Sequence, residues 1–232
     1  SYTLDNVSKH FIGDSKVDLK RIATVLRRLK PDLVALQEID HTCTRSGKVN
    51  QAAALGTLLG MHHRFGKFMD FQGGQYGLAI LSRFPIQKSV RHQLAPGAEP
   101  RCALEVTVRP TTSGPLLSFV SIHNDWTREP FRIAQVNDLL MGLAERRHPI
   151  ILAGDFNAEP EAESLARIKA SGFAILAKKN GTRTFPSRSP TIEIDYFMTR
   201  GISFKTAPLT QVHDERLASD HRPIVMELPL SR

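Results

Sequence analysis

The sequence has few cysteines and no long apolar run, and both absences exclude classes of protein. Only two cysteines, Cys43 and Cys102, occur among 232 residues, too few for a disulfide-rich scaffold or a cysteine-based zinc protein. A single bridge between them is one alternative, but the sequence favours two free thiols. No run approaches the roughly 20 apolar residues that a membrane-spanning helix needs. We therefore expect no transmembrane segment.

The composition predicts a globular chain with a basic surface. Hydrophobic residues make up 41% and charged residues 23%, which is enough apolar material for a core. A formal net charge of +8 favours an anionic partner, such as nucleic acid, a phospholipid surface or a phosphorylated small molecule. The length fits one domain over residues 1–232, and we expect a monomer. The chain begins at Ser1, so secreted, periplasmic and cytoplasmic locations all stay open.

Periodicity and turn residues predict a chain that alternates between strands and helices. Helices are expected at residues 17–29, 51–59, 129–146 and 161–171. Strands are expected at residues 2–7, 32–37, 62–68, 76–82, 86–94, 101–109, 116–123, 150–153, 193–199, 202–208 and 223–228. Helices near both ends of two strand-rich stretches favour an α+β fold in which two packed sheets lie between helices.

Polar side chains stand at the ends of several of these apolar strands. The residues at these ends are Glu38, His123, Asp155, Asn157, Asp195, Asp220 and His221. Each alone is explained equally well as a helix cap, a loop carboxylate or a core histidine. Together they predict a site, because strand ends fix geometry while leaving side chains accessible. Carboxylate and amide oxygens without cysteine favour Mg²⁺, with Mn²⁺ as the alternative.

Four short blocks resemble the signature of the endonuclease/exonuclease/phosphatase superfamily. They are Gln-Glu at residues 37–38, Gly-Asp-Phe-Asn at 154–157, Ile-Asp-Tyr at 194–196 and Ser-Asp-His-Arg-Pro at 219–223. Similar proteins include DNase-I-like nucleases, abasic-site endonucleases, sphingomyelinases and inositol-phosphate phosphatases. The resemblance implies a four-layer α/β/β/α sandwich and metal-dependent hydrolysis of a phosphate ester.

The resemblance also implies which residues form the metal side of the site. Glu38 resembles the principal Mg²⁺ ligand of the family, and Asp220 resembles a further carboxylate of the metal site. Asn6 resembles the asparagine that helps to position metal and phosphate. Leu78 departs from the pattern, since many similar proteins have asparagine there, and this departure concerns the choice of substrate.

On the phosphate side the resemblance implies two groups of residues. Asp155 and Asn157 resemble the pair that orients and deprotonates the attacking water and holds a phosphate oxygen. His221 resembles the histidine that contacts the scissile phosphate, with Asp195 as its orienting carboxylate. His123 matches a second histidine near the phosphate in DNase-I-like members. Elementary chemistry agrees with these roles, because phosphodiester hydrolysis needs an activated water and donors for the developing negative charge.

The predicted substrate contacts beside the site are one cation, Arg101, and two aromatic residues, Trp126 and Tyr76. Trp126 closely follows His123 and suits stacking on a base or sugar, contact with a membrane surface, or simple packing. The sequence favours a nuclease-type phosphodiesterase. A phospholipid, phosphoinositide or sphingomyelin hydrolase is the main alternative. An inactive binding module is disfavoured, because the main chemical positions are filled.

Overall fold

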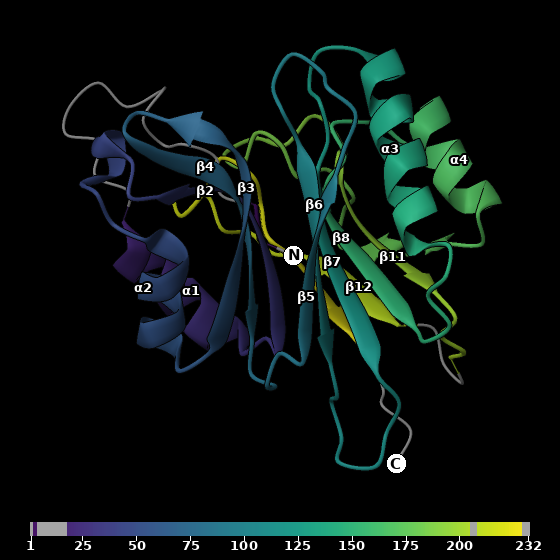
Figure 1. Cartoon of the computed structure of the whole chain (residues 1–232), viewed down its shortest axis with the longest axis horizontal. Helices are drawn as coiled ribbons and strands as arrows, with labels where there is room; N and C mark the ends of the chain where they lie inside the picture. Colours follow the sequence, from purple (N-terminus) through teal and green to yellow (C-terminus); the bar gives the residue numbers. More distant parts are fainter. Residues whose placement is uncertain (1, 4–17, 205–207, 229–232) are drawn as a thin grey trace.

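The computed structural model describes residues 2–3, 18–204 and 208–228, and these residues form two large β-sheets and one small sheet (Figure 1). The four-stranded sheet has the order β1-β2-β4-β3, and the six-stranded sheet has the order β5-β6-β7-β8-β11-β9. The small sheet has the order β10-β12-β13. The strands are β1 (Tyr2–Thr3), β2 (Leu33–His41), β3 (His62–Phe71), β4 (Gly74–Ser82), β5 (Lys88–Gln93), β6 (Cys102–Val108), β7 (Leu117–His123), β8 (Ile150–Asp155), β9 (Ala174–Ile175), β10 (Lys178–Lys179), β11 (Asp195–Arg200), β12 (Leu209–Val212) and β13 (Ile224–Glu227).

Two pairs of helices cover the outer faces of the two large sheets (Figure 1). Helices α1 (Leu19–Leu29) and α2 (Gln51–Leu59) pack on the four-stranded sheet through one apolar cluster. Helices α3 (Glu129–Leu143) and α4 (Glu163–Ala170) pack on the six-stranded sheet through a second cluster. The result is the α/β/β/α sandwich that the sequence predicted.

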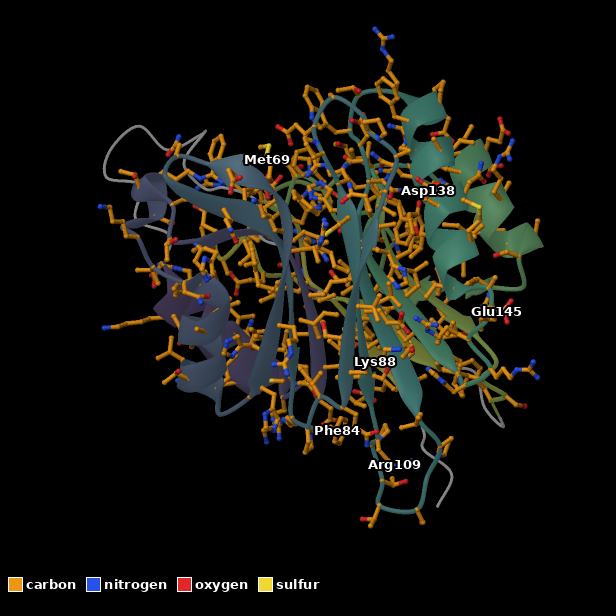
Figure 2. All side chains as sticks on the ribbon, in the orientation of Figure 1. Met69, Phe84, Lys88, Arg109, Asp138 and Glu145 are labelled. Atoms are coloured by element: carbon orange, nitrogen blue, oxygen red, sulfur yellow. The ribbon has the colours of Figure 1, made fainter. Side chains whose placement is uncertain are left out.

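A third apolar cluster lies between the two large sheets. Ala35 and Ile80 from one sheet and Val106 and Phe119 from the other belong to it, and all four are buried. Side chains of this kind fill the space between the sheets (Figure 2). Because such interiors pack as densely as organic crystals, this cluster holds the strands on either side of it, and therefore their ends, in fixed positions.

Capping residues set the ends of the first two helices. The Asp18 carboxylate accepts a hydrogen bond from the Arg21 amide at the start of α1, and Asn50 caps α2 in the same way. Both helices end at a residue in the left-handed region, Lys30 for α1 and Gly60 for α2. The predicted helix at 51–59 is confirmed. The predicted helix at 17–29 is observed from Leu19, and residue 17 lies outside the described residues.

Several predicted boundaries were wrong, and one predicted strand was misplaced. The strand expected at 32–37 continues to His41, so Glu38 lies inside β2 and not at its end. Residues 202–204, expected to begin a strand, are irregular, and β12 starts only at Leu209. Apolar composition alone does not fix these limits, because pairing with a neighbouring strand decides where a strand ends.

The described residues bear on two expectations, one about thiols and one about membrane spans. Cys43 and Cys102 are both free and buried, which confirms the preference for two thiols. Burial raises the pKa of Cys43 to about 11, so this thiol stays protonated at neutral pH. Within the described ranges, no helix has the length and apolar character needed to cross a membrane.

Candidate active site

Three neighbouring strands bring predicted site residues into one row at the end of the six-stranded sheet. In the parallel β7–β8 pair, His123 lies opposite Asp155. In the antiparallel β8–β11 pair, Asp155 lies opposite Asp195. Neighbouring side chains in register project from the same face of a sheet, and Nε2 of His123 lies 3.6 Å from Oδ2 of Asp155. Sheet register therefore groups residues that are far apart in the sequence.

His221 joins this row from the loop between β12 and β13. Its Nδ1 lies 2.8 Å from Oδ2 of Asp195, and its Nε2 lies 3.9 Å from Oδ2 of Asp155. Burial disfavours the charged imidazole, but the nearby Asp195 and Asp155 carboxylates outweigh it and raise the pKa of His221 to about 10. His221 is therefore a cation at neutral pH. Its ring also lies 4.7 Å from the ring of Phe185, measured between centroids.

Asp155 is a buried carboxylate whose surroundings alter its acidity. Asp155 is only 3% exposed. Burial, helped by the charge of Asp195 and opposed by that of His221, raises the pKa of Asp155 to about 7. A carboxylate that titrates near neutral pH is suited to accept a proton from water and release it again.

The Gly-Asp-Phe-Asn block spans the last two residues of β8 and the tight turn that follows them. A side chain at Gly154 would place its Cβ 2.0 Å from the Ile122 carbonyl oxygen, so the approach of β8 to β7 requires glycine. Phe156 is fully buried in the cluster under α3 and α4. Asn157 has a φ of 48° and donates its backbone amide to Oδ1 of Asp155 at 2.7 Å. The turn thus fixes both polar side chains while Phe156 anchors it in the core.

Glu38 lies on the other large sheet, at an irregularity in β2. The pairing of β2 with β4 shifts between Leu36 and Ile39, and Glu38 has a φ of 57°. Such bulges re-aim a side chain and are frequent beside active sites. The neighbouring Gln37 donates from Nε2 to Oγ of Ser121 at 2.9 Å. This bond ties β2 to β7 across the sandwich, two residues before His123.

The ligand atoms of Asp155, Asp195 and His221 all lie within 4.8 Å of one another, a spacing that could hold a metal ion. Glu38 and Asp220, the predicted metal ligands, are not members of this group. Asp220 is half-buried directly before His221. Asn6 lies outside the described residues, so its predicted role has no structural description.

The three predicted substrate contacts differ sharply in exposure. Trp126 is 65% exposed, as expected of a residue beside the site. Tyr76 is 6% exposed, so the prediction of a rim aromatic was wrong, because its ring packs in the core between the sheets. Burial raises the pKa of Tyr76, and a hydrogen bond with Glu38 raises it further. Tyr76 therefore contacts the Glu38 side chain from the core between the sheets.

Arg101, expected as a loop cation beside the site, is only 2% exposed. Its Nη2 lies 3.1 Å from Oε2 of Glu99, and its guanidinium carbon lies 5.0 Å from the centroid of the Phe68 ring. Nε and Nη1 have no hydrogen-bond partner within the described part of the chain. The positive charge of Arg101 acts on Asp155, so it contributes to the same electrostatic field.

Two residues that touch this group were not predicted. Asn124 is fully buried, and neither Oδ1 nor Nδ2 has a hydrogen-bond partner among the described residues. Its position next to His123 was the available signal. Thr184 donates its hydroxyl to Oδ2 of Asp195. Its loop carries no periodic pattern, so no sequence signal indicated it.

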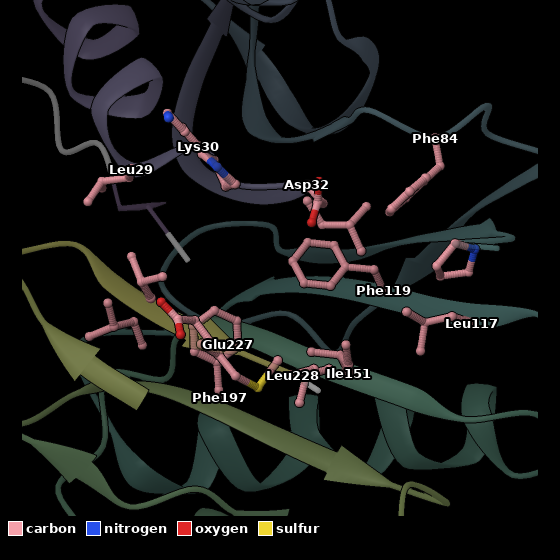
Figure 3. A pocket seen from close by; sticks show the side chains of 16 residues that line it. Leu29, Lys30, Asp32, Phe84, Leu117, Phe119, Ile151, Phe197, Glu227 and Leu228 are labelled. Carbon is pink, nitrogen blue, oxygen red and sulfur yellow. The ribbon is translucent and has the colours of Figure 1, made fainter. Parts of the chain in front are cut away.

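A separate cavity of about 310 Å³ lies away from this group, at the start of β2 and β7 (Figure 3). Leu33, Leu117 and Phe119 line it together with Phe197 and Ile224, and its wall is largely apolar. None of the predicted site residues lines it. Large apolar pockets are the usual first guess for a site, but here the titratable side chains lie at the opposite end of β7.

The sandwich and the side chains at its strand ends define a hydrolase scaffold for phosphate esters. The chain belongs to the Endonuclease/Exonuclease/phosphatase family, which it matches over residues 6–221. Proteins of this family in general hydrolyse phosphate esters and depend on divalent metals. Among curated relatives, YbhP of Escherichia coli strain K12 is 25% identical over 244 residues, covering 97% of this chain and 94% of YbhP.

Solved structures with the same fold come from proteins with different names. A conserved protein of Enterococcus faecalis V583 has a TM-score of 0.76 at 21% identity, covering 91% of this chain and 90% of that one. A mannosyl-6-phosphatase of Bacteroides thetaiotaomicron has a TM-score of 0.74 at 17% identity, covering 91% and 90%. The catalytic domain of human nocturnin, with bound sulfate, has a TM-score of 0.65 at 20% identity, covering 91% and 88%. At these identities the likeness establishes the fold.

Proposed function

We propose that this protein is a Mg²⁺-dependent phosphodiesterase of the nuclease type, with Mn²⁺ as an alternative ion. The observation that carries the proposal is the grouping of Asp155, Asp195 and His221, with His123 beside Asp155. This group combines a carboxylate that titrates near pH 7 with an imidazolium that is stable at neutral pH. Hydrolysis of a phosphodiester needs both a proton acceptor for water and a donor for the phosphoryl oxygens.

The roles of the individual residues follow from their contacts. Asp155 accepts the proton of the attacking water, and Asn157, whose backbone amide donates to Oδ1 of Asp155, belongs in our proposal to the same side of the phosphate. His221 donates from Nε2 to a phosphate oxygen, and Asp195 orients the ring and favours its charged form through Nδ1. His123 contributes a second imidazole beside Asp155.

The donor set fits a hard divalent cation. In our proposal Glu38 and Asp220 hold the ion together with Asn6, and these residues offer carboxylate and amide oxygens without sulfur. Both cysteines are buried elsewhere as free thiols. A bound divalent cation stabilises charge on the phosphate oxygens and assists the leaving group.

Arg101 supports an anionic substrate. A buried guanidinium with free Nε and Nη1 donors beside Asp155 is well suited to a phosphate oxygen, because charge-assisted bonds of this kind are strong and directional. The formal charge of +8 agrees with a polyanion. Related folds include a phosphatase of a small sugar phosphate, so fold alone leaves the substrate open.

Hydrolysis of bis(p-nitrophenyl) phosphate tests the proposed chemistry directly. We expect turnover with Mg²⁺ that EDTA abolishes and that Glu38→Ala loses. A panel of plasmid DNA, abasic duplex, sphingomyelin and phosphoinositides then separates nuclease from lipid hydrolase. Activity on a lipid without activity on nucleic acid would overturn the nuclease assignment and retain the hydrolase scaffold.

Salt dependence gives an independent test of the polyanion. Binding of duplex DNA to Glu38→Gln protein should weaken with salt, with a slope of log affinity against log salt of roughly −0.9 per contacted phosphate. Binding of a substrate with one phosphate has a shallow slope. A flat response with DNA would remove the nucleic-acid interpretation.

A further inference from the structure

Trp126 is an aromatic side chain held in solvent at the edge of the candidate site. It is 65% exposed, whereas every other Phe, Tyr or Trp side chain of the described residues is buried or half-buried. It is also the single tryptophan of the chain. Indole rings usually contribute their large apolar area to a core or an interface. An indole that remains exposed in a folded protein is therefore available to a partner.

Hydrogen bonds of Asp125, the residue before Trp126, hold the loop that carries the indole in place. The fully buried Asp125 accepts hydrogen bonds at Oδ1 from the amides of Thr127, at 2.7 Å, and Arg128, at 3.3 Å. The Thr127 hydroxyl also donates to Oδ1, and the Asp125 amide donates to Oε1 of Gln135 in α3. A rigid platform loses little conformational entropy when a ligand binds to it.

Asp125 also ties this loop to the loop between β5 and β6. The amide of Ala98 donates to Oδ2 of Asp125 at 2.7 Å. A side chain at Gly97 would place its Cβ 2.3 Å from the same oxygen, so the contact requires glycine there. The two loops lie side by side at the top of Figure 1, and the second leads directly to Arg101. The buried Asp125 carboxylate thus joins the loop that carries Trp126 to the loop that precedes Arg101.

The same loop begins inside the candidate site. The amide of Asn124 donates to the Asp155 carbonyl oxygen at 3.0 Å, and Nδ2 of Asn157 donates to the Asn124 carbonyl oxygen at 3.0 Å. Trp126 follows two residues later, and the exposed Arg128 follows two residues after that. The backbone that carries Trp126 therefore leaves the candidate site only two residues before the indole.

Resting on the phosphodiesterase function proposed above, we propose that Trp126 is the platform on which a nucleobase of a single-stranded or unpaired nucleic-acid segment stacks beside the scissile phosphate. Aromatic stacking accepts any base, and a nearby arginine serves the strand backbone. A membrane surface fits less well, because the other exposed large apolar residues are scattered over separate elements: Val49, Leu58, Met141 and Leu217.

Fluorescence of the single tryptophan reports stacking without any turnover. Oligothymidylate should quench the emission of wild-type protein in EDTA and of Asp155→Asn protein in Mg²⁺. An abasic strand with the same phosphates should bind without this quenching. Binding of oligothymidylate, measured by anisotropy, without quenching would overturn the proposal. So would a blue shift with anionic vesicles combined with no response to the oligonucleotide.

Kinetics with two substrates separate this proposal from the phosphodiesterase function. In Trp126→Ala, kcat/KM for an oligothymidylate should fall about tenfold relative to kcat/KM for methyl p-nitrophenyl phosphate. Trp126→Phe should recover part of this ratio, and Met141→Ala, which removes another exposed apolar side chain, should leave it unchanged. Equal ratios in wild type and Trp126→Ala would overturn the stacking role. If methyl p-nitrophenyl phosphate is still cleaved in that case, the phosphodiesterase function stands.

Discussion

Asp195 and His221 form a direct pair, with Oδ2 of the carboxylate 2.8 Å from Nδ1 of the imidazole, although they lie 26 positions apart in the chain. The sequence predicted this hydrogen bond, and the structure confirms it. Both residues are almost fully buried, so the carboxylate acts on the imidazole with little screening by water. The pair leaves Nε2 of His221 facing Asp155, which is the side on which the proposed chemistry takes place.

Replacing Asp195 by asparagine should show what the pair contributes. Asp195→Asn keeps the shape but removes the charge that holds the pKa of His221 up, so burial will lower that pKa. We expect kcat for bis(p-nitrophenyl) phosphate to fall by roughly 10²- to 10⁴-fold, the range of a lost acid or base. Thr184→Val is the matched control, since it removes a hydrogen bond to Asp195 and leaves its charge. A rate near that of wild type in Asp195→Asn would contradict the assignment.

Asp155→Asn should affect turnover far more than binding. An amide cannot accept the proton of water, but it preserves the volume of the side chain. We expect a loss of at least roughly 100-fold in kcat with a small change in KM. Asp138→Asn on α3 makes the same chemical change away from the site and should leave both constants unaltered. A rise in KM with kcat preserved would identify Asp155 as a binding residue.

Glu38→Gln should weaken the affinity for Mg²⁺ and abolish metal-dependent turnover. The amide loses the negative charge that a hard cation requires. Isothermal titration calorimetry with Mg²⁺ measures the affinity, and circular dichroism checks the fold. Glu145→Gln, an exposed change after α3, is the control that should bind Mg²⁺ like wild type. Near-wild-type turnover of Glu38→Gln at saturating Mg²⁺ would remove Glu38 from the metal site.

The pH dependence of kcat/KM should be bell-shaped. Asp155 acts when deprotonated, and its raised pKa of about 7 means that the rate climbs as the pH rises through that value. His221 acts when protonated, and its raised pKa of about 10 means that the rate falls as the pH passes that value. Asp195→Asn should move the alkaline limb to lower pH. An alkaline limb that stays in place in this variant would show that another group titrates there.

The layers of the fold and the strand-end residues were predictable because they depend on local patterns. Gly60 marked the end of α2, and short polar motifs at the ends of apolar strands located Asp155 and His221. These signals belong to a few consecutive positions, so one sequence carries them. The prediction of the Asp195–His221 contact needed the family resemblance in addition.

Other features depend on contacts between distant segments and were not predictable. The bulge that places Glu38 inside β2 comes from pairing with β4, which apolar spacing does not encode. The burial of Arg101 and Tyr76 depends on how the two sheets meet. The link from Asp125 to Ala98 joins two loops 27 positions apart. Nothing in the local sequence of either loop specifies its partner.

A buried ionic cluster on β6, outside the candidate site, leads to a prediction about stability. Glu105 is 1% exposed and accepts two hydrogen bonds from Arg146, at 2.9 and 3.0 Å. Oγ of Ser118 also donates to it, and Nε2 of His92 lies 2.8 Å from Oε2. Burial opposes ionisation, but these contacts outweigh it and lower the pKa of Glu105 from 4.5 to about 2.

This depressed pKa makes folding stability depend on pH in acid. The ionised Glu105 stabilises the native state fully above its ordinary value of 4.5, and the stabilisation is lost as the pH falls from there toward about 2. The shift corresponds to a contribution on the order of 3 kcal/mol.

Glu105→Gln should lower the free energy of unfolding by that order at pH 7, measured with urea. The difference from wild type should shrink at pH 3, because there Glu105 takes up a proton in the unfolded wild-type chain, which stabilises the unfolded state, while it stays largely ionised in the native state. Glu163→Gln, in the exposed pair with Arg167, should cost less than about 1 kcal/mol at either pH. A difference between Glu105→Gln and wild type that is equal at pH 7 and pH 3 would show that the lost stability does not come from the charge.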